Sequence, residues 1–76
     1  MSFEKVKEII VETINCGAEE VTLEANLKED LNVDSLDAVE LNMALEEAFN
    51  VTISDEELSA FVTVKDIVDY IDAHIA

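Results

Sequence analysis

Residues 34–50 read DSLDAVELNMALEEAFN and give the strongest structural signal in the chain. Between Ser35 and Phe49 there is neither glycine nor proline, and most residues are good helix formers, so the stretch predicts a helix from Ser35 to about Asn50. Asp34 stands just before it and is a suitable N-cap, because its carboxylate can accept a hydrogen bond from an unpaired N–H of the first turn. This is the longest helix that the sequence predicts.

At about 100° per residue, the predicted helix has two separate apolar arcs. The core arc consists of Ala38, Leu41, Leu45, Ala48 and Phe49. The second arc lies roughly opposite and consists of Leu36, Val39 and Met43, with Glu40 and Glu47 on one edge and Glu46 on the other. Because a small bundle needs only one apolar face on such a helix, the second arc indicates a docking surface with an apolar centre and an acidic rim. The alternative is that the second arc packs under a loop.

The segment before this helix is predicted to be one helix and a long connection. Its apolar residues fall at helical spacing in the first part of the chain: Phe3, Val6, Ile9, Ile10 and Ile14. They predict a helix from about Phe3 to Ile14, with Ser2 as N-cap and with Gly17 free to adopt the left-handed backbone that ends it. From residue 18 to about residue 33 no period holds, so we expect a long loop anchored on the core by Val21, Leu23, Leu27 and Leu31.

Two capping boxes follow the long helix. Ser54 and Glu57 have the spacing of the first box, which opens a short helix ending near Ala60. Thr63 and Asp66 form a weaker box, after which Val64, Ile67, Val68, Ile71 and Ile75 make an apolar stripe. No segment alternates for long enough to predict a strand. The sequence therefore predicts a single all-α domain over residues 1–76: a small bundle of three main helices plus one short helix, with a long loop between helices one and two.

Composition restricts the partners. The chain has 19 acidic and 4 basic residues, and its formal net charge is −15. Nucleic acid and anionic membranes are disfavoured, because both are bound through lysine and arginine, so the expected partners carry basic patches. No apolar run approaches the roughly 20 residues that span a bilayer, and no secretory signal is visible. We expect a cytoplasmic monomer without membrane insertion, in which Cys16, the one cysteine, is a packed thiol.

A family resemblance rests on residues 29–41, EDLNVDSLDAVEL, and on MALEEAF at residues 43–49. Together with ISDEE at 53–57 and TVKDIVDYI at 63–71, this sequence resembles the acyl carrier proteins of dissociated fatty acid synthesis over nearly the whole chain. Three positions depart from the family's pattern. Asn42 stands where an apolar residue is usual, which bears on the shape of an acyl pocket, and Phe61 is bulkier than expected near the end of the third helix. Asn32 replaces a frequent glycine, and asparagine also tolerates a left-handed backbone.

The resemblance implies a carrier and not an enzyme. The serine that matches Ser35 is esterified in this family with 4′-phosphopantetheine, taken from coenzyme A by a phosphopantetheinyl transferase. The expected cofactor-binding residues are Ser35 and its two neighbours, Asp34 and Leu36. The thiol of this arm carries acyl groups as thioesters between enzymes of fatty acid synthesis. The second helix docks on basic patches of these partners. The expected partner-binding residues here are Leu36, Asp37, Val39, Glu40, Met43, Glu46 and Glu47.

Asp30, Asn32 and Asp34 have the spacing of the first ligands of a calcium loop. Ser35 and Leu41 stand where such a loop needs glycine and glutamate, so no metal site is predicted. His74 is expected to interact with the C-terminus of the last helix rather than to act as a base toward Ser35. Two alternatives stay open at this point: a carrier of the same fold serving polyketide, lipid-A or aminoacyl transfer, and an acidic module that binds calcium or a protein partner.

Overall fold

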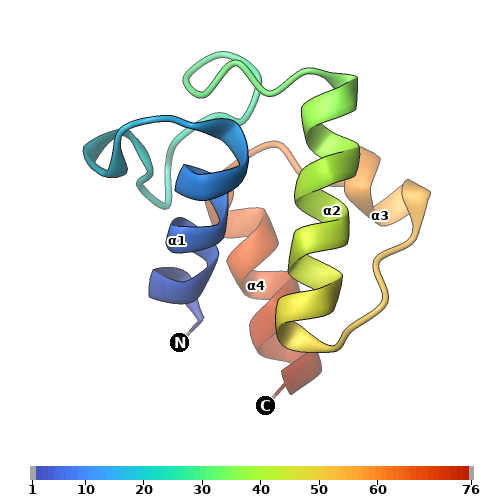
Figure 1. Ribbon diagram of the computed structural model, residues 1–76. Coiled ribbons are helices and arrows are strands. Elements are labelled where there is room, and N and C mark those ends of the chain that lie inside the picture. Colours follow the sequence, from blue (N-terminus) through green and yellow to red (C-terminus); the bar gives the residue numbers. More distant parts are fainter. Residues whose placement is uncertain (1, 76) are drawn as a thin grey trace.

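The computed structural model describes residues 2–75, which form four α-helices and one short 3-10 helix (Figure 1). The elements are α1 (Phe3–Ile14), η1 (Ala18–Glu20), α2 (Ser35–Phe49), α3 (Asp55–Ala60) and α4 (Val64–Ile75). Helix α1 packs against both α2 and α4. Within residues 2–75 there is no strand, only an isolated antiparallel bridge between Asn26 and Thr63. The prediction of an all-α bundle with one short helix is confirmed.

The core includes residues from the long loop as well as from the helices. Its members from helices α1, α2 and α4 are Val6, Ile9, Ile10, Leu41, Leu45, Val64, Ile67, Val68 and Ile71. Val21, Leu27 and Leu31 of the α1–α2 loop are also buried, and Leu23 is half-buried against them. The loop is therefore anchored as predicted, and it positions the start of α2.

The two arcs of α2 have different surroundings. Leu41 and Leu45 of the core arc are buried, whereas Leu36, Val39 and Met43 are 69%, 50% and 61% exposed. The alternative that this second arc packs under a loop is therefore wrong. Two core predictions are also wrong: Ala48 is exposed, and so is Ile75 of the stripe on α4. Each lies in the last turn of its helix, at the end of the bundle, where little of the core remains to cover it.

Helix α1 has the predicted bounds, but the capping interactions at its two ends differ from the prediction. Asn15, and not Gly17, adopts the left-handed backbone that ends α1, with φ of 63° against −74° at Gly17. Asparagine tolerates this region because its short polar side chain fits there. The Ser2 hydroxyl makes no capping hydrogen bond. Instead the Ser2 N–H donates to Asp72 Oδ1 at 2.9 Å, which ties the start of α1 to α4.

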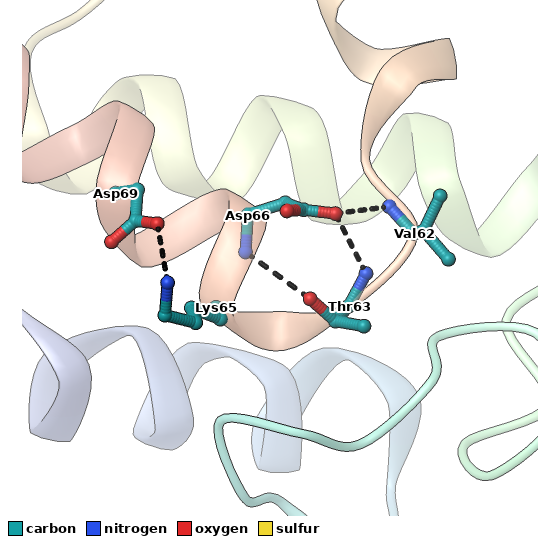
Figure 2. Close-up of polar contacts among 5 residues, drawn as sticks. All are labelled: Val62, Thr63, Lys65, Asp66 and Asp69. Atoms are coloured by element: carbon teal, nitrogen blue, oxygen red, sulfur yellow. Dashed lines mark hydrogen bonds and ion pairs between the residues drawn. The ribbon is translucent and has the colours of Figure 1, made fainter.

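The predicted capping box at the start of α4 is present (Figure 2). Asp66 Oδ2 accepts from the N–H groups of Val62 and Thr63 at 2.9 and 3.1 Å, and Thr63 Oγ1 accepts from Asp66 N–H at 3.4 Å. The same segment holds the α1–α2 loop, because Leu27 N–H donates to Val62 O and Val64 N–H donates to Ala25 O. This corner therefore fixes the loop that leads to α2.

Asp66→Asn is expected to destabilise the protein by about 0.5–2 kcal/mol at neutral pH, the usual effect of losing a helix cap. The two backbone N–H groups lower the pKa of Asp66 in the folded state. The carboxylate therefore contributes its stability above the unfolded pKa of about 3.9, and this contribution is lost as pH falls through the lower folded pKa. Thermal unfolding of wild type and variant between pH 3 and pH 7 should show a gap that closes only at the acidic end.

Asp69→Asn on the same helix is the control for this prediction. It makes the same change in charge but removes only an exposed ion pair, Lys65–Asp69 at 3.3 Å (Figure 2). Such a pair contributes about 0.3–0.5 kcal/mol. Equal losses in the two variants would contradict the capping role of Asp66.

Asn42 carries a buried polar atom without a partner. Its side-chain oxygen is buried and accepts no hydrogen bond among residues 2–75. An unsatisfied buried polar atom costs about 1–3 kcal/mol, so we expect Asn42→Val to raise the melting temperature of the unmodified protein by a few degrees. Asn42→Asp, which puts a carboxylate at the same place, should lower it. Calorimetry measures both, and a lower melting temperature for Asn42→Val would show that the amide stabilises the fold.

Candidate functional site

Ser35 occupies the first position of α2 and is exposed to solvent. Asp34 caps the helix just before it, with its Oδ1 accepting from Asp37 N–H at 2.8 Å, and Asp37 Oδ2 accepts from Asp34 N–H at 3.5 Å. The N-terminal end of a long helix carries a partial positive charge. A phosphate ester on the Ser35 hydroxyl would lie near that charge, so the local geometry suits a phosphorylated group.

The turn before α2 holds Ser35 in place. Asn32 adopts a left-handed backbone with φ of 56°, as predicted from the tolerance of asparagine for this region. Leu31 and Val33 on either side of it are buried, and Val33 N–H donates to Leu27 O at 2.8 Å. The backbone is therefore anchored to the core at Val33, two residues before Ser35. This anchoring fixes the position of Ser35 at the surface.

A pocket of about 550 Å³ lies beside Ser35. Its walls are mostly apolar and come from α2, α3, α4 and the two loops, with polar groups from the residues around Ser35 and from α3. The lining residues are Leu27, Lys28, Val33, Asp34, Ser35, Ala38, Val39, Leu41, Leu45, Asp55, Leu58, Ser59, Phe61 and Ile67. This volume lies in the range of pockets that bind small ligands, and its walls suit an apolar chain.

Sequence reasoning missed most of this pocket. Phe61 lines it, so the bulky residue that departs from the family's pattern bears on the pocket, whereas Asn42 is not among the lining residues. Lys28 and Ser59 line it too, and no sequence pattern pointed to either. They come from different segments that only tertiary packing brings together.

Two hydrogen bonds fasten the loop between α2 and α3. Glu46 Oε2 accepts from Ile53 N–H at 2.7 Å, and the Tyr70 hydroxyl donates to Thr52 O at 2.8 Å. Figure 1 shows this loop running from the end of α2 back up to α3. These contacts hold α3 against the pocket. They also give Glu46 a structural role that its place on the acidic rim did not indicate.

The second arc of α2 and its rim form an exposed face, which we call the docking surface: Leu36, Asp37, Val39, Glu40, Met43, Glu46 and Glu47. Glu40 and Glu47 are exposed, whereas Asp37 and Glu46 are half-buried and hydrogen-bonded to backbone N–H groups. Val39 belongs both to this face and to the pocket wall. The exposed charges of this face are therefore mainly those of Glu40 and Glu47.

The remaining candidate residues have ordinary surroundings. Cys16 is half-buried against the core, and burial raises the pKa of its thiol. His74 Nδ1 lies 2.8 Å from the Tyr70 backbone oxygen, and its ring stacks on Tyr70. Figure 1 shows the end of α4, which carries His74, at the opposite end of the bundle from the start of α2. The structure does not bring His74 together with Ser35.

Within residues 2–75, no group of three or more histidine, cysteine, aspartate or glutamate side chains is arranged to hold a metal ion. In the same part of the chain, each helix is too short or too polar to cross a bilayer.

Comparison with known proteins identifies the family. Residues 4–71 match the family described as the phosphopantetheine attachment site. The acyl carrier protein of Helicobacter hepaticus is 53% identical over 73 residues, which is 96% of this chain and 96% of the relative. That of Wolinella succinogenes is 51% identical over 95% of both chains, and that of Phytoplasma australiense is 46% identical over 100% of both. The chain belongs to the acyl carrier protein family.

Proposed function

We propose that this protein carries acyl intermediates of fatty acid synthesis on a 4′-phosphopantetheine arm attached to Ser35 Oγ, and that it is a carrier and not a catalyst. The observation that supports this most strongly is the position of Ser35. Its exposed hydroxyl begins α2, inside the segment that matches the phosphopantetheine attachment family, and it borders an apolar pocket. The arm supplies a thiol that holds acyl groups as thioesters.

The residues around Ser35 fit this group. The Asp34 cap fixes the first turn of α2, so that the hydroxyl points from the positive end of the helix, where an anionic ester is favoured. Leu36 is exposed beside it and offers apolar contact to a partner. The apolar walls of the pocket, among them Leu41, Leu45 and Phe61, can shelter an acyl chain from water.

The docking surface is the proposed contact with partner enzymes. Its centre is apolar and exposed at Leu36, Val39 and Met43, and its rim carries carboxylates in a chain of net charge −15. Such a surface complements a basic patch, which increases the rate of encounter and selects partners. The proposed partners are the phosphopantetheinyl transferase and enzymes of fatty acid synthesis.

Two measurements test this proposal. Intact mass of the protein, before and after incubation with coenzyme A and a broad-specificity phosphopantetheinyl transferase, should show the addition of one 4′-phosphopantetheine. Acyl groups trapped on the arm in cells should then be those of fatty acid synthesis. Absence of any mass increase would exclude a carrier role, whereas a polyketide or aminoacyl group on the arm would assign the carrier to another pathway.

We further propose a monomer that acts in the cytoplasm. The net charge of −15 supports a monomer, because copies of so acidic a chain repel one another. Light scattering after size-exclusion chromatography at physiological salt should give the mass of one chain. The cytoplasmic location stays a prediction, and cell fractionation tests it.

A further inference from the structure

Lys28 is a cation in an unusual place for this chain. The four basic residues of the sequence are Lys5, Lys7, Lys28 and Lys65. Lys28 is the one basic residue that lines the pocket beside Ser35, together with Asp34. A positive charge is uncommon in a chain with 19 acidic and 4 basic residues, and this one lies beside the proposed attachment site.

The backbone around Lys28 is fixed by hydrogen bonds. Asn26 Oδ1 accepts from the N–H groups of Lys28 and Glu29 at 3.0 and 2.9 Å, and Asp30 Oδ2 accepts from Asn26 N–H at 2.7 Å. Leu27, the preceding residue, donates its N–H to Val62 O at 2.9 Å. The turn that carries Lys28 is therefore held at the mouth of the pocket.

The same hydrogen bonds bring this turn next to Ser35. Leu27 O accepts from Val33 N–H at 2.8 Å, so the residue before Lys28 is bonded directly to the residue before Asp34. Lys28 and Ser35 thus extend from two adjoining segments, and both line the same pocket. Lysine has a long and flexible four-carbon stem, so the ammonium group can move over the part of the pocket that Ser35 also lines.

The Lys28 ammonium group is available for such an anion. Among residues 2–75, the one ion pair is Lys65–Asp69, and it does not involve Lys28. Side-chain hydrogen bonds around Lys28 use its backbone N–H, not its ammonium group. A phosphodiester on Ser35 would add a negative charge next to the carboxylates of Asp34 and Asp37, and a nearby cation offsets that repulsion.

We infer that Lys28 is a positioning residue for the arm: its ammonium group pairs with the phosphodiester that joins Ser35 to 4′-phosphopantetheine and holds the first part of the arm over the pocket. This inference rests on the proposed attachment at Ser35. Because Lys28 is exposed, the pair is screened by salt and its energetic contribution is modest. The consequence is a bias of the arm toward the pocket rather than toward solvent.

The test compares unmodified and modified forms of wild type, Lys28→Gln, Lys28→Arg and the control Lys5→Gln. Lys5→Gln makes the same charge change in the first turn of α1, at the other end of the bundle from the start of α2 (Figure 1). Loading is established by intact mass. The phosphorus NMR resonance of the modified protein and the change in melting temperature on modification are then measured at about 0.1 M and about 1 M salt.

In Lys28→Gln the phosphorus resonance should shift relative to wild type at low salt. The difference in melting temperature between the modified and the unmodified form should be about 1–4 °C less favourable to the modified form than it is in wild type. Both differences should disappear at high salt, and Lys28→Arg and Lys5→Gln should resemble wild type. If wild type loads but Lys28→Gln behaves like Lys5→Gln, then the role of Lys28 is wrong while the carrier function stands. If wild type does not load, the carrier function itself fails.

Discussion

Ser35→Ala is expected to fold like the wild type and to gain no 4′-phosphopantetheine from coenzyme A and the transferase. The fold should be retained because Ser35 is exposed, because the helix cap is provided by Asp34, and because alanine favours the first turn of a helix. Loading should be lost completely, since the phosphodiester needs a hydroxyl oxygen at this position. Circular dichroism and intact mass measure the two outcomes on the same sample.

Ser59→Ala is the matched control. Ser59 is another hydroxyl in the lining of the same pocket, on α3 rather than at the start of α2. The Ser59→Ala variant should load to the wild-type extent, because Ser59 lies on α3 and not at the start of α2, where the family motif stands. Mass added to Ser35→Ala on any other residue, or loss of loading in Ser59→Ala, would place the attachment elsewhere.

The helices were predictable because their determinants are local. The boundaries of α2 follow from an uninterrupted run of helix formers and from a cap whose geometry involves only Asp34 and Asp37. The bounds of α1 were predicted for the same reason, but its caps were not, because they depend on contacts with distant parts of the chain. Gly17 and Asn15 both tolerate a left-handed backbone, and the choice between them depends on how the following loop packs. Ser2 interacts with Asp72, which lies 70 residues away, and spacing carries no information about such a contact.

The candidate site was predictable only in part. Ser35 and the acidic helix lie within one continuous motif, so sequence pattern was enough to single them out. The pocket was not, because Lys28, Ser59 and Phe61 come from three segments that meet only after the α1–α2 loop packs against the start of α4. Likewise, the sequence did not distinguish the glutamates of the acidic rim from one another. In the structure Glu46 accepts a hydrogen bond from Ile53 N–H, so the exposed glutamates of the rim are Glu40 and Glu47.

Glu40→Lys should slow association with a basic partner, such as the transferase or a condensing enzyme, by about tenfold at 0.1 M salt. Glu40 is exposed on the docking surface, so its charge acts at a distance on the approaching patch. The effect should shrink at 1 M salt, where the Debye length falls from about 10 Å to about 3 Å. Stopped-flow or surface-binding kinetics at several salt concentrations measure the association rate.

Met43→Ala should instead speed dissociation, by roughly tenfold, with little dependence on salt. Met43 is 61% exposed and lies at the apolar centre of the docking surface, so its truncation removes contact area and leaves the charge unchanged. The two variants therefore separate the functions of rim and centre in a single kinetic experiment. If Met43→Ala also slowed association, Met43 would act before the contact forms. The proposed division of roles between rim and centre would then be wrong.

Glu8→Lys decides between a local docking surface and a general effect of charge. Glu8 is exposed on α1, and its replacement changes the net charge of −15 by the same amount as Glu40→Lys does. Because Glu8 lies on α1, outside the docking surface, Glu8→Lys should slow association much less than Glu40→Lys does at 0.1 M salt if partners dock on α2. Equal slowing by Glu8→Lys and Glu40→Lys would mean that partners respond to overall charge. The docking surface on α2 would then be wrong, even with the arm on Ser35.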